Sequence, residues 1–264
     1  GGGRETMKSL VQVRVDPPSG TIILDRPLKA NAITRYGLEQ LKAALEDLHQ
    51  EQKVRAIILT GTGPVFSAGT DLVELEETRD EVDCDSQWQA DVACYRDVLL
   101  SILRFPKPTI AALNGPACGT GAGLALACDL LIAAESASIA FPEVKLGLVA
   151  GVSAPLLRFR VGAAGAARIL LGGQPVPATE LLSIGIASSV VPDDLVWARA
   201  HELAGELEEL VPEAVTMTKR LLNETLGESL ATEMSVGAAM MATARTTESA
   251  QQALEKWKGE SPAP

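Results

Sequence analysis

The chain is poor in aromatic residues and in basic charge, and each shortage excludes a class of protein. Only 3% of its 264 residues are aromatic, so alanine, leucine and valine must fill any core. The formal net charge is −11, and no basic cluster interrupts the acidic sequence, which argues against nucleic-acid binding. A polyanionic ligand would therefore depend on a local basic pocket and not on the overall field.

Cysteine, histidine and long apolar runs are equally sparse. The four cysteines include no Cys-x-x-Cys pair, which predicts free thiols in a reducing compartment. His49 and His201 lie in expected amphipathic helices, so we expect neither a metal site nor a Ser-His-Asp triad. No apolar run is long enough to span a membrane and no signal-peptide core is visible, so the expected location is the cytoplasm or the mitochondrial matrix, without secretion.

The N-terminal segment predicts a hairpin followed by a helix. Apolar and polar residues alternate over 10–15 and again over 21–25, with a Pro-Pro-Ser-Gly turn between them. Leucines recur at three- and four-residue spacing over 36–50, which is typical of an amphipathic helix. Thr34 is the expected N-cap of that helix.

Strands and helices then alternate along the chain. Short apolar runs at 56–60, 109–113 and 130–134 predict strands that are covered on both faces. Helical patterns over 88–104 and 120–128 lie between them. This alternation indicates an α/β fold with right-handed crossovers.

From about residue 154 the pattern predicts helices throughout, punctuated by glycine and proline. The expected helices cover residues 156–161, 163–171, 178–184, 194–210, 212–225, 232–245 and 248–257.

Three segments carry the residues that can form a functional site. The first is Phe-Ser-Ala-Gly-Thr-Asp at 66–71, the second is the glycine-rich run at 114–123, and the third is Phe-Pro-Glu at 141–143. Glycines at alternate positions permit close backbone approach, and a following helix start would direct N–H groups at a ligand. The second segment lacks the Gly-Lys-Ser/Thr of a Walker loop. Each segment alone is also typical of an ordinary turn or helix start.

In this order, the three segments resemble the crotonase superfamily, also called the enoyl-CoA hydratase/isomerase family. The similarity extends over roughly residues 10–258. It implies a crotonase-like spiral of β-β-α repeats over residues 8–200 and a C-terminal helical region over 201–264 that forms a homotrimer or hexamer. It also implies an acyl-CoA thioester as substrate in fatty acid metabolism, with coenzyme A as part of the substrate and no further cofactor.

The resemblance assigns roles to individual positions. The backbone N–H groups of Thr70 and Thr120 match an oxyanion hole, and Glu143 matches the catalytic carboxylate. Apolar neighbours such as Phe141 would bury Glu143 and raise its pKa, which makes it a better base near neutral pH. The expected contacts to coenzyme A and substrate are Arg26, Lys29, Ala30, Ala68, Asp71, Leu72 and Lys256.

One departure from the family pattern shapes the expected activity. Gly123 stands where the hydratases of that family carry a second glutamate, and Asp129 on the same helix is not expected to substitute. A single base can still move a proton from C2 to C4, and this single-glutamate arrangement resembles that of the mitochondrial-type Δ3,Δ2-enoyl-CoA isomerases. The resemblance implies an isomerase with Glu143 as acid and base. If the missing carboxylate limits hydration, Gly123→Glu is expected to raise hydratase activity.

Other functions remain compatible with the same segments. A hydratase could take its second acid from the acidic segment 71–86. Other crotonase chemistries, such as decarboxylation or thioester hydrolysis, use the same oxyanion hole with different partners. The loss of one catalytic residue also fits a non-catalytic acyl-CoA-binding protein, although the retention of Glu143 argues against it.

Overall fold

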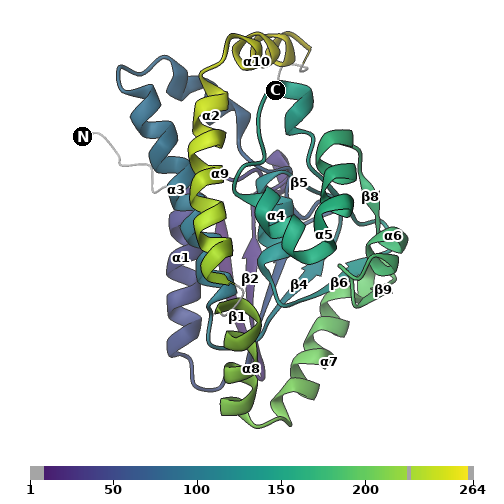
Figure 1. The fold of residues 1–264 in the computed structure, drawn as a ribbon. Coiled ribbons are helices and arrows are strands. Elements are labelled where there is room, and N and C mark those ends of the chain that lie inside the picture. Colours follow the sequence, from purple (N-terminus) through teal and green to yellow (C-terminus); the bar gives the residue numbers. More distant parts are fainter. Residues whose placement is uncertain (1–8, 225–226, 261–264) are drawn as a thin grey trace, which may run out of the picture.

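A sheet with the strand order β1-β2-β3-β4-β6-β9 forms the centre of the chain, whose computed structural model describes residues 9–224 and 227–260 (Figure 1). β1 pairs antiparallel with β2, and the other neighbouring strands of this sheet pair in parallel. The strands are β1 (Val11–Asp16), β2 (Ser19–Leu24), β3 (Ala56–Gly61), β4 (Thr109–Leu113), β6 (Leu130–Ala134) and β9 (Ser189–Val191).

Most of the helices match expected segments, with two exceptions. The helices are α1 (Arg35–Gln50), α2 (Leu72–Arg79), α3 (Cys84–Leu103), α4 (Thr120–Ala127), α5 (Ser153–Gly172), α6 (Ala178–Ser183), α7 (Val196–Glu208), α8 (Pro212–Glu224), α9 (Gly227–Arg245) and α10 (Glu248–Glu260). Helix α2 was not among the expected helices, and the segments 156–161 and 163–171, expected as two helices, are joined in the one element α5. Short 3-10 segments are η1 (Pro27–Lys29), η2 (Glu143–Leu146) and η3 (Asp193–Leu195). The predicted N-cap is confirmed, because the Thr34 side chain accepts a hydrogen bond from Gly37 N at 3.0 Å.

The expected hairpin and the three buried strands are confirmed. The side chains of β2 show which helices cover the two faces of the sheet. Successive side chains of a strand point to opposite faces. On one face, Ser19 and Thr21 bond to His201 and Trp197 of α7. On the other face, Gly20 lies against Leu48 of α1. Helices thus cover both faces of the sheet.

The prediction that the chain is helical throughout after residue 154 is wrong. β9 extends the central sheet beside β6, and β8 (Val176–Pro177) joins β5 (Ala117–Cys118) and β7 (Ser138–Ala140) in a small second sheet. These strands have two or three residues each, which is too short to produce a readable alternation. The second sheet holds the glycine-rich segment, because β5 lies within that segment.

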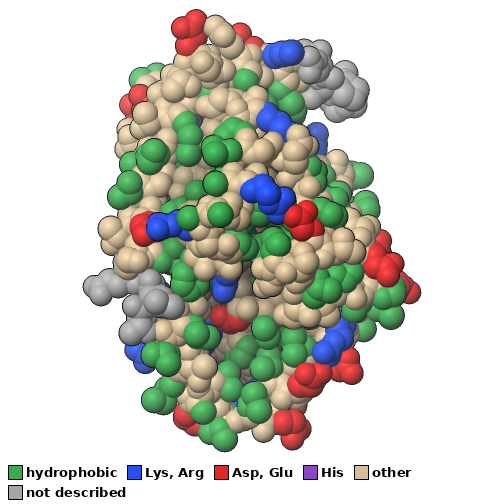
Figure 2. Space-filling view, turned by 45° about the vertical axis from the view of Figure 1, so that its right-hand side comes forward, with side chains coloured by type: hydrophobic (Ala, Val, Ile, Leu, Met, Phe, Trp, Pro, Cys, Tyr) green, Lys and Arg blue, Asp and Glu red, His purple; other side chains and the backbone are tan. Residues whose placement is uncertain are grey.

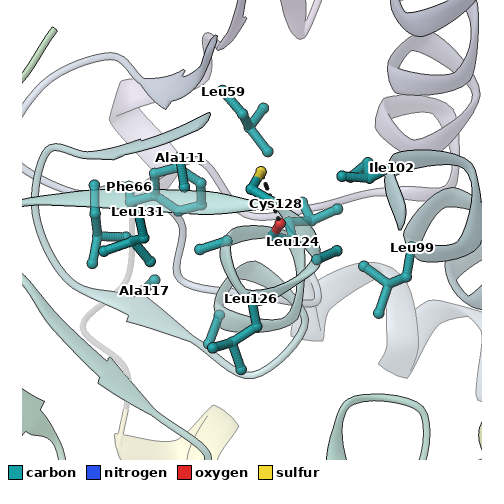
Figure 3. Packing of buried hydrophobic residues seen from close by; sticks show 14 of the residues in the cluster. Leu59, Phe66, Leu99, Ile102, Ala111, Ala117, Leu124, Leu126, Cys128 and Leu131 are labelled. Carbon is teal, nitrogen blue, oxygen red and sulfur yellow. Dashed lines mark hydrogen bonds between the residues drawn. The ribbon is translucent and has the colours of Figure 1, made fainter. Parts of the chain in front are cut away.

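Helix α4 is the element that connects the core to the site. All of its residues are buried, as expected of a helix that is apolar on every side. Leu124 and Leu126 lie among Phe66, Leu99 and Leu131 in the packed interior (Figure 3). Helix α3 packs against α4, and it also packs against α1 and α9 (Figure 1). The division of the chain into 8–200 and 201–264 stays a prediction.

The surface shown in Figure 2 carries charges of both signs. Lys and Arg side chains alternate there with Asp and Glu and do not gather into one basic patch. Within residues 9–224 and 227–260, none of the helices combines the length and apolar content needed to cross a lipid bilayer.

Candidate active site

The first two predicted segments lie backbone to backbone. Cys118 N donates to Ser67 O at 2.9 Å, and Phe66 N donates to Pro116 O at 3.0 Å. Gly69 has a φ of 93°, and a Cβ at this position would lie 2.6 Å from Cys118 O. Glycine is therefore required at 69 both by its conformation and by the close approach of the second segment.

The contact between these segments brings Thr70 and Thr120 together. Their hydroxyl oxygens lie 3.2 Å apart. Thr120 is the first residue of α4, where backbone N–H groups have no partner within the helix. Within the part of the chain that the structure describes, neither the Thr70 nor the Thr120 amide donates a hydrogen bond. Two uncommitted N–H donors on adjacent segments can serve a carbonyl oxygen that gains negative charge.

Glu143 is the carboxylate beside these two residues. It begins η2, and its Oε1 lies close to Gly119, where a Cβ would be only 2.8 Å from this oxygen. Its Oε2 is buried and has no hydrogen-bond partner among the described residues. Burial raises the pKa of Glu143 from its usual 4.5 to about 7. A carboxylate of this kind can both take up and release a proton near neutral pH.

Tyr95 fills the place that a side chain at Gly123 would need. A Cβ at Gly123 would overlap Tyr95 Oη and would lie 2.5 Å from Ser153 Oγ. Tyr95 comes from α3, is 2% exposed, donates to Thr120 O at 3.1 Å and lies 2.8 Å from Ser153 Oγ. Burial raises the pKa of Tyr95, and the nearby Glu143 carboxylate adds to that effect, so the phenol stays neutral at neutral pH.

These contacts bear on two expectations from the sequence. A side chain at position 123 would have to displace Tyr95 and Ser153, so the effect of Gly123→Glu on hydratase activity stays a prediction that depends on these two residues moving. Asp129 was not expected to replace the missing glutamate, and its carboxylate is held elsewhere. Its Oδ2 lies 2.7 Å from Lys219 Nζ and accepts from Thr109 N at 2.8 Å.

The predicted contacts for coenzyme A near the N-terminus form one connected group. Arg26 forms an ion pair with Asp71, which also caps α2 by accepting from Val73 N at 2.9 Å. Ala68 N donates to Ala30 O at 2.8 Å. The structure therefore brings Arg26, Ala30, Ala68 and Asp71 beside Thr70, and it gives each of them a partner within the chain. Their contact with a ligand stays a prediction.

The remaining predicted contacts lie on separate elements. Lys29 is exposed in η1, and Leu72 begins α2 and packs near the buried Trp88. Lys256 is exposed on α10, which packs against η2, the segment that carries Glu143. The C-terminal helix thus lies beside the candidate site, at its rim.

A cavity beside the two threonines contains residues that the sequence did not single out. Thr70, Thr120 and Tyr95 line it together with Arg245, at the end of α9. Tyr95 could not be found from sequence, because its contacts to Thr120 and Ser153 cross 25 and 58 residues. Arg245 did leave a signal. It continues the helical stripe of Met234, Ala238 and Met241, each at most 8% exposed.

Comparisons with known proteins point to one family. Residues 20–262 match the sequence profile of the family described as "Enoyl-CoA hydratase/isomerase". A Thermus thermophilus protein whose name assigns it to the enoyl-CoA hydratases is 37% identical over 201 residues, which is 76% of this chain and 79% of that protein. A mitochondrial protein of Rattus norvegicus, named as containing an enoyl-CoA hydratase domain, is 28% identical over 96% of this chain and 83% of its own length.

A solved structure gives the same result for the fold. The crystal structure of an enoyl-CoA hydratase/isomerase from Mycobacterium paratuberculosis superposes with a TM-score of 0.86 and 28% identity. The match covers 95% of this chain and 99% of that one. The expected crotonase-like α/β fold is thereby confirmed.

Proposed function

Because this chain belongs to the enoyl-CoA hydratase/isomerase family, we propose that it moves a double bond within an acyl-CoA thioester, converting 3-enoyl-CoA into 2-trans-enoyl-CoA. The observation that carries this proposal is the environment of Gly123. Tyr95 and Ser153 occupy the space of a second carboxylate, while Glu143 is retained with a pKa of about 7. Of the two carboxylate positions that the hydratases use, this site retains the one at Glu143, and one proton carrier is what a 1,3-proton shift requires.

In the proposed reaction, Glu143 transfers a single proton between two carbons. The carboxylate removes a proton from C2, and the C3–C4 double bond and the thioester carbonyl become a dienolate. The Thr70 and Thr120 N–H groups donate to its oxygen, and each such donor can lower the barrier by about 3 kcal/mol. Protonated Glu143 then returns the proton to C4, which leaves the double bond between C2 and C3. Proton transfer and charge stabilisation both come from the chain, so the proposal needs no metal or additional cofactor.

We assign Tyr95 a positioning role in this reaction. Its hydroxyl donates to Thr120 O, and this bond fixes the peptide that begins α4. Its raised pKa keeps the phenol protonated, so Tyr95 is not a second base.

We further propose that coenzyme A lies over η1 and over the segment 66–71 that precedes α2. Arg26, Lys29 and Lys256 would approach its phosphates, and the Ala30 and Ala68 backbones would approach its adenosine. Binding of this remote part orients the acyl group for proton transfer.

Hydration of 2-enoyl-CoA is the second candidate function. Glu74 lies in the acidic segment and lines the cavity beside Thr70 and Thr120, and burial raises its pKa. The similar Thermus thermophilus protein is named as a hydratase. Against this candidate, Glu74 Oε2 already accepts from Arg35 N at 2.9 Å.

Self-association is proposed for the C-terminal helices. Met217 and Leu222 of α8, and Val236 and Met240 of α9, are between 56% and 68% exposed. Exposed apolar side chains on adjacent helices are typical of a surface that binds another protein surface. We propose that these faces contribute to a homotrimer or a hexamer.

The pH dependence of the reaction tests the proposed role of Glu143. The base must be ionised to remove the C2 proton, so kcat/KM for 3-hexenoyl-CoA should rise with pH and reach half its maximum near the pKa of about 7. Below that pH the carboxyl is protonated and the rate falls tenfold per pH unit. Circular dichroism across the same range serves as the control for folding. A flat profile between about pH 5.5 and 8.5 would contradict a base with this pKa.

A further inference from the structure

A buried arginine is one of the residues that line the cavity beside the two threonines. The cavity has a volume of about 30 Å³, enough for one or two water molecules or a small polar group. Thr70, Thr120 and Tyr95 line it on the side of the proposed reaction, and Arg35, Asp91 and Arg245 also line it. This space adjoins the position proposed for the thioester carbonyl, because Thr70 and Thr120 belong to both.

Arg245 is unusual because its charge is buried without a partner. The residue is 5% exposed, and within the described residues its guanidinium makes no hydrogen bond and no ion pair. Burial lowers the pKa of Arg245 to about 10, and the charge of Asp91 partly opposes that change. The C-terminal end of α9 favours a cation. It does not satisfy the five N–H donors of a guanidinium.

The neighbouring charges already have partners. Asp91 binds Arg35 with both oxygens, at 2.6 and 2.8 Å from its Nε and Nη2 atoms. Glu74 accepts from Arg35 N. The Arg245 guanidinium therefore presents hydrogen-bond donors at the cavity wall, and no acceptor among the described residues is bonded to them.

From this arrangement we infer that Arg245 binds a carboxylate at the far end of a short acyl chain, so that the preferred substrates are acyl-CoA thioesters with a second, terminal carboxyl group. The inference rests on the proposed function, because that function places the thioester carbonyl between Thr70 and Thr120. A guanidinium and a carboxylate form two parallel hydrogen bonds, which selects this group by geometry as well as by charge. The cavity has room for the terminal carboxylate and not for a long alkyl chain.

Binding of saturated thioesters tests the inference without requiring turnover. The probes are three pairs of equal chain length: succinyl- and butyryl-CoA, glutaryl- and valeryl-CoA, and adipoyl- and hexanoyl-CoA. Isothermal titration of the wild-type protein should show at least one carboxyacyl ester binding about 10- to 100-fold more tightly than its neutral partner. If every neutral ester binds as tightly as its carboxyacyl partner, the inference is wrong.

Variants then locate the preference. Arg245→Met should bring the ratio for that pair to about one and leave binding of the neutral ester unchanged, whereas Arg245→Lys should retain part of the ratio. Arg168→Met is the control, because Arg168 is exposed and pairs with Glu180 on the surface. A ratio that survives Arg245→Met would overturn the inference even if the wild-type protein shows the preference.

The proposed function and this inference fail in different ways. If hexanoyl-CoA and adipoyl-CoA both bind but no 3-enoyl-CoA is converted, the isomerase proposal fails and the binding ratio still decides the role of Arg245. If 3-hexenoyl-CoA is converted and no pair shows a preference for the carboxylate, only the inference fails.

Discussion

Replacement of Glu143 by glutamine is expected to lower kcat for 3-hexenoyl-CoA isomerisation by roughly 100- to 10,000-fold, which is the usual contribution of a general acid and base. Glutamine has nearly the same shape but cannot accept the C2 proton. The rate of double-bond migration, followed by the absorbance of the 2-enoyl thioester, measures the loss. Glu209→Gln is the matched control, because it removes an exposed carboxylate at the end of α7. A Glu143→Gln variant with most of the wild-type rate would remove Glu143 from the mechanism.

The same substitution should stabilise the protein at alkaline pH, which separates lost chemistry from lost structure. Folded Glu143 keeps its proton up to about pH 7, whereas the unfolded chain releases it near the usual value of 4.5. Between these values the folded state binds more protons, so the free energy of unfolding falls as the pH rises. The loss is complete above pH 7 and amounts to roughly 3 kcal/mol at most. Glu143→Gln lacks this titration.

Denaturant unfolding at two pH values measures this effect. At pH 8 the Glu143→Gln variant should be more stable than the wild-type protein by roughly 1–3 kcal/mol. Below about pH 4.5 the two should differ little, because wild-type Glu143 is then protonated in both states. If the variant is less stable than the wild-type protein at pH 8, the ionised Glu143 carboxylate does not destabilise the folded state, which contradicts the prediction.

Introduction of glutamate at Gly123 should destabilise the protein strongly, by about 3 kcal/mol or more, because overpacking a buried site forces its neighbours apart. The new Cβ would overlap Tyr95 Oη and crowd Ser153. The double variant Tyr95→Ala/Gly123→Glu removes the obstruction. The loss of unfolding free energy in the double variant should be about 1–3 kcal/mol smaller than the sum of the losses in the two single variants. The double variant should also hydrate crotonyl-CoA faster than the wild-type protein.

Thermal unfolding of the single and double variants, together with hydration rates, measures this prediction. Gly205→Glu is the control, because Gly205 lies in α7 and has no atom within 4 Å of its Cβ position. If Gly123→Glu folded with wild-type stability, Tyr95 would not occupy the position as described. If the double variant folded without any gain in hydration, the absence of a second carboxylate would not be what limits this reaction.

The local pattern of the sequence predicted the central elements of the fold correctly. The unbroken apolar runs of β3, β4 and β6 have this composition because helices cover both faces of the sheet. Thr34 was recognisable as an N-cap because the interaction spans three residues. The short strand β9 was not recognisable, because its three residues are half exposed and gain their structure only from pairing with β6.

The sequence predicted the residues of the candidate site that lie in its three motifs, and it did not predict the residues that other elements contribute. Gly69 and Gly119 are readable because each has a local cause, the positive φ that glycine adopts most easily. The contact of Tyr95 with Gly123 joins α3 to α4 and depends on how the two helices pack. Sequence reasoning therefore recognised that a carboxylate was missing at Gly123 but did not identify the side chain that replaces it.

Two rates on one preparation test the central claim that this site has a single acid/base. Isomerisation of 3-hexenoyl-CoA and hydration of crotonyl-CoA are measured on the wild-type protein at the same pH and concentration. The single-base site should isomerise the first substrate and hydrate the second at least about 100-fold more slowly. Hydration at a rate comparable to isomerisation would show that a second acid acts beside Glu143, with Glu74 of the cavity wall as the candidate, and would contradict the account.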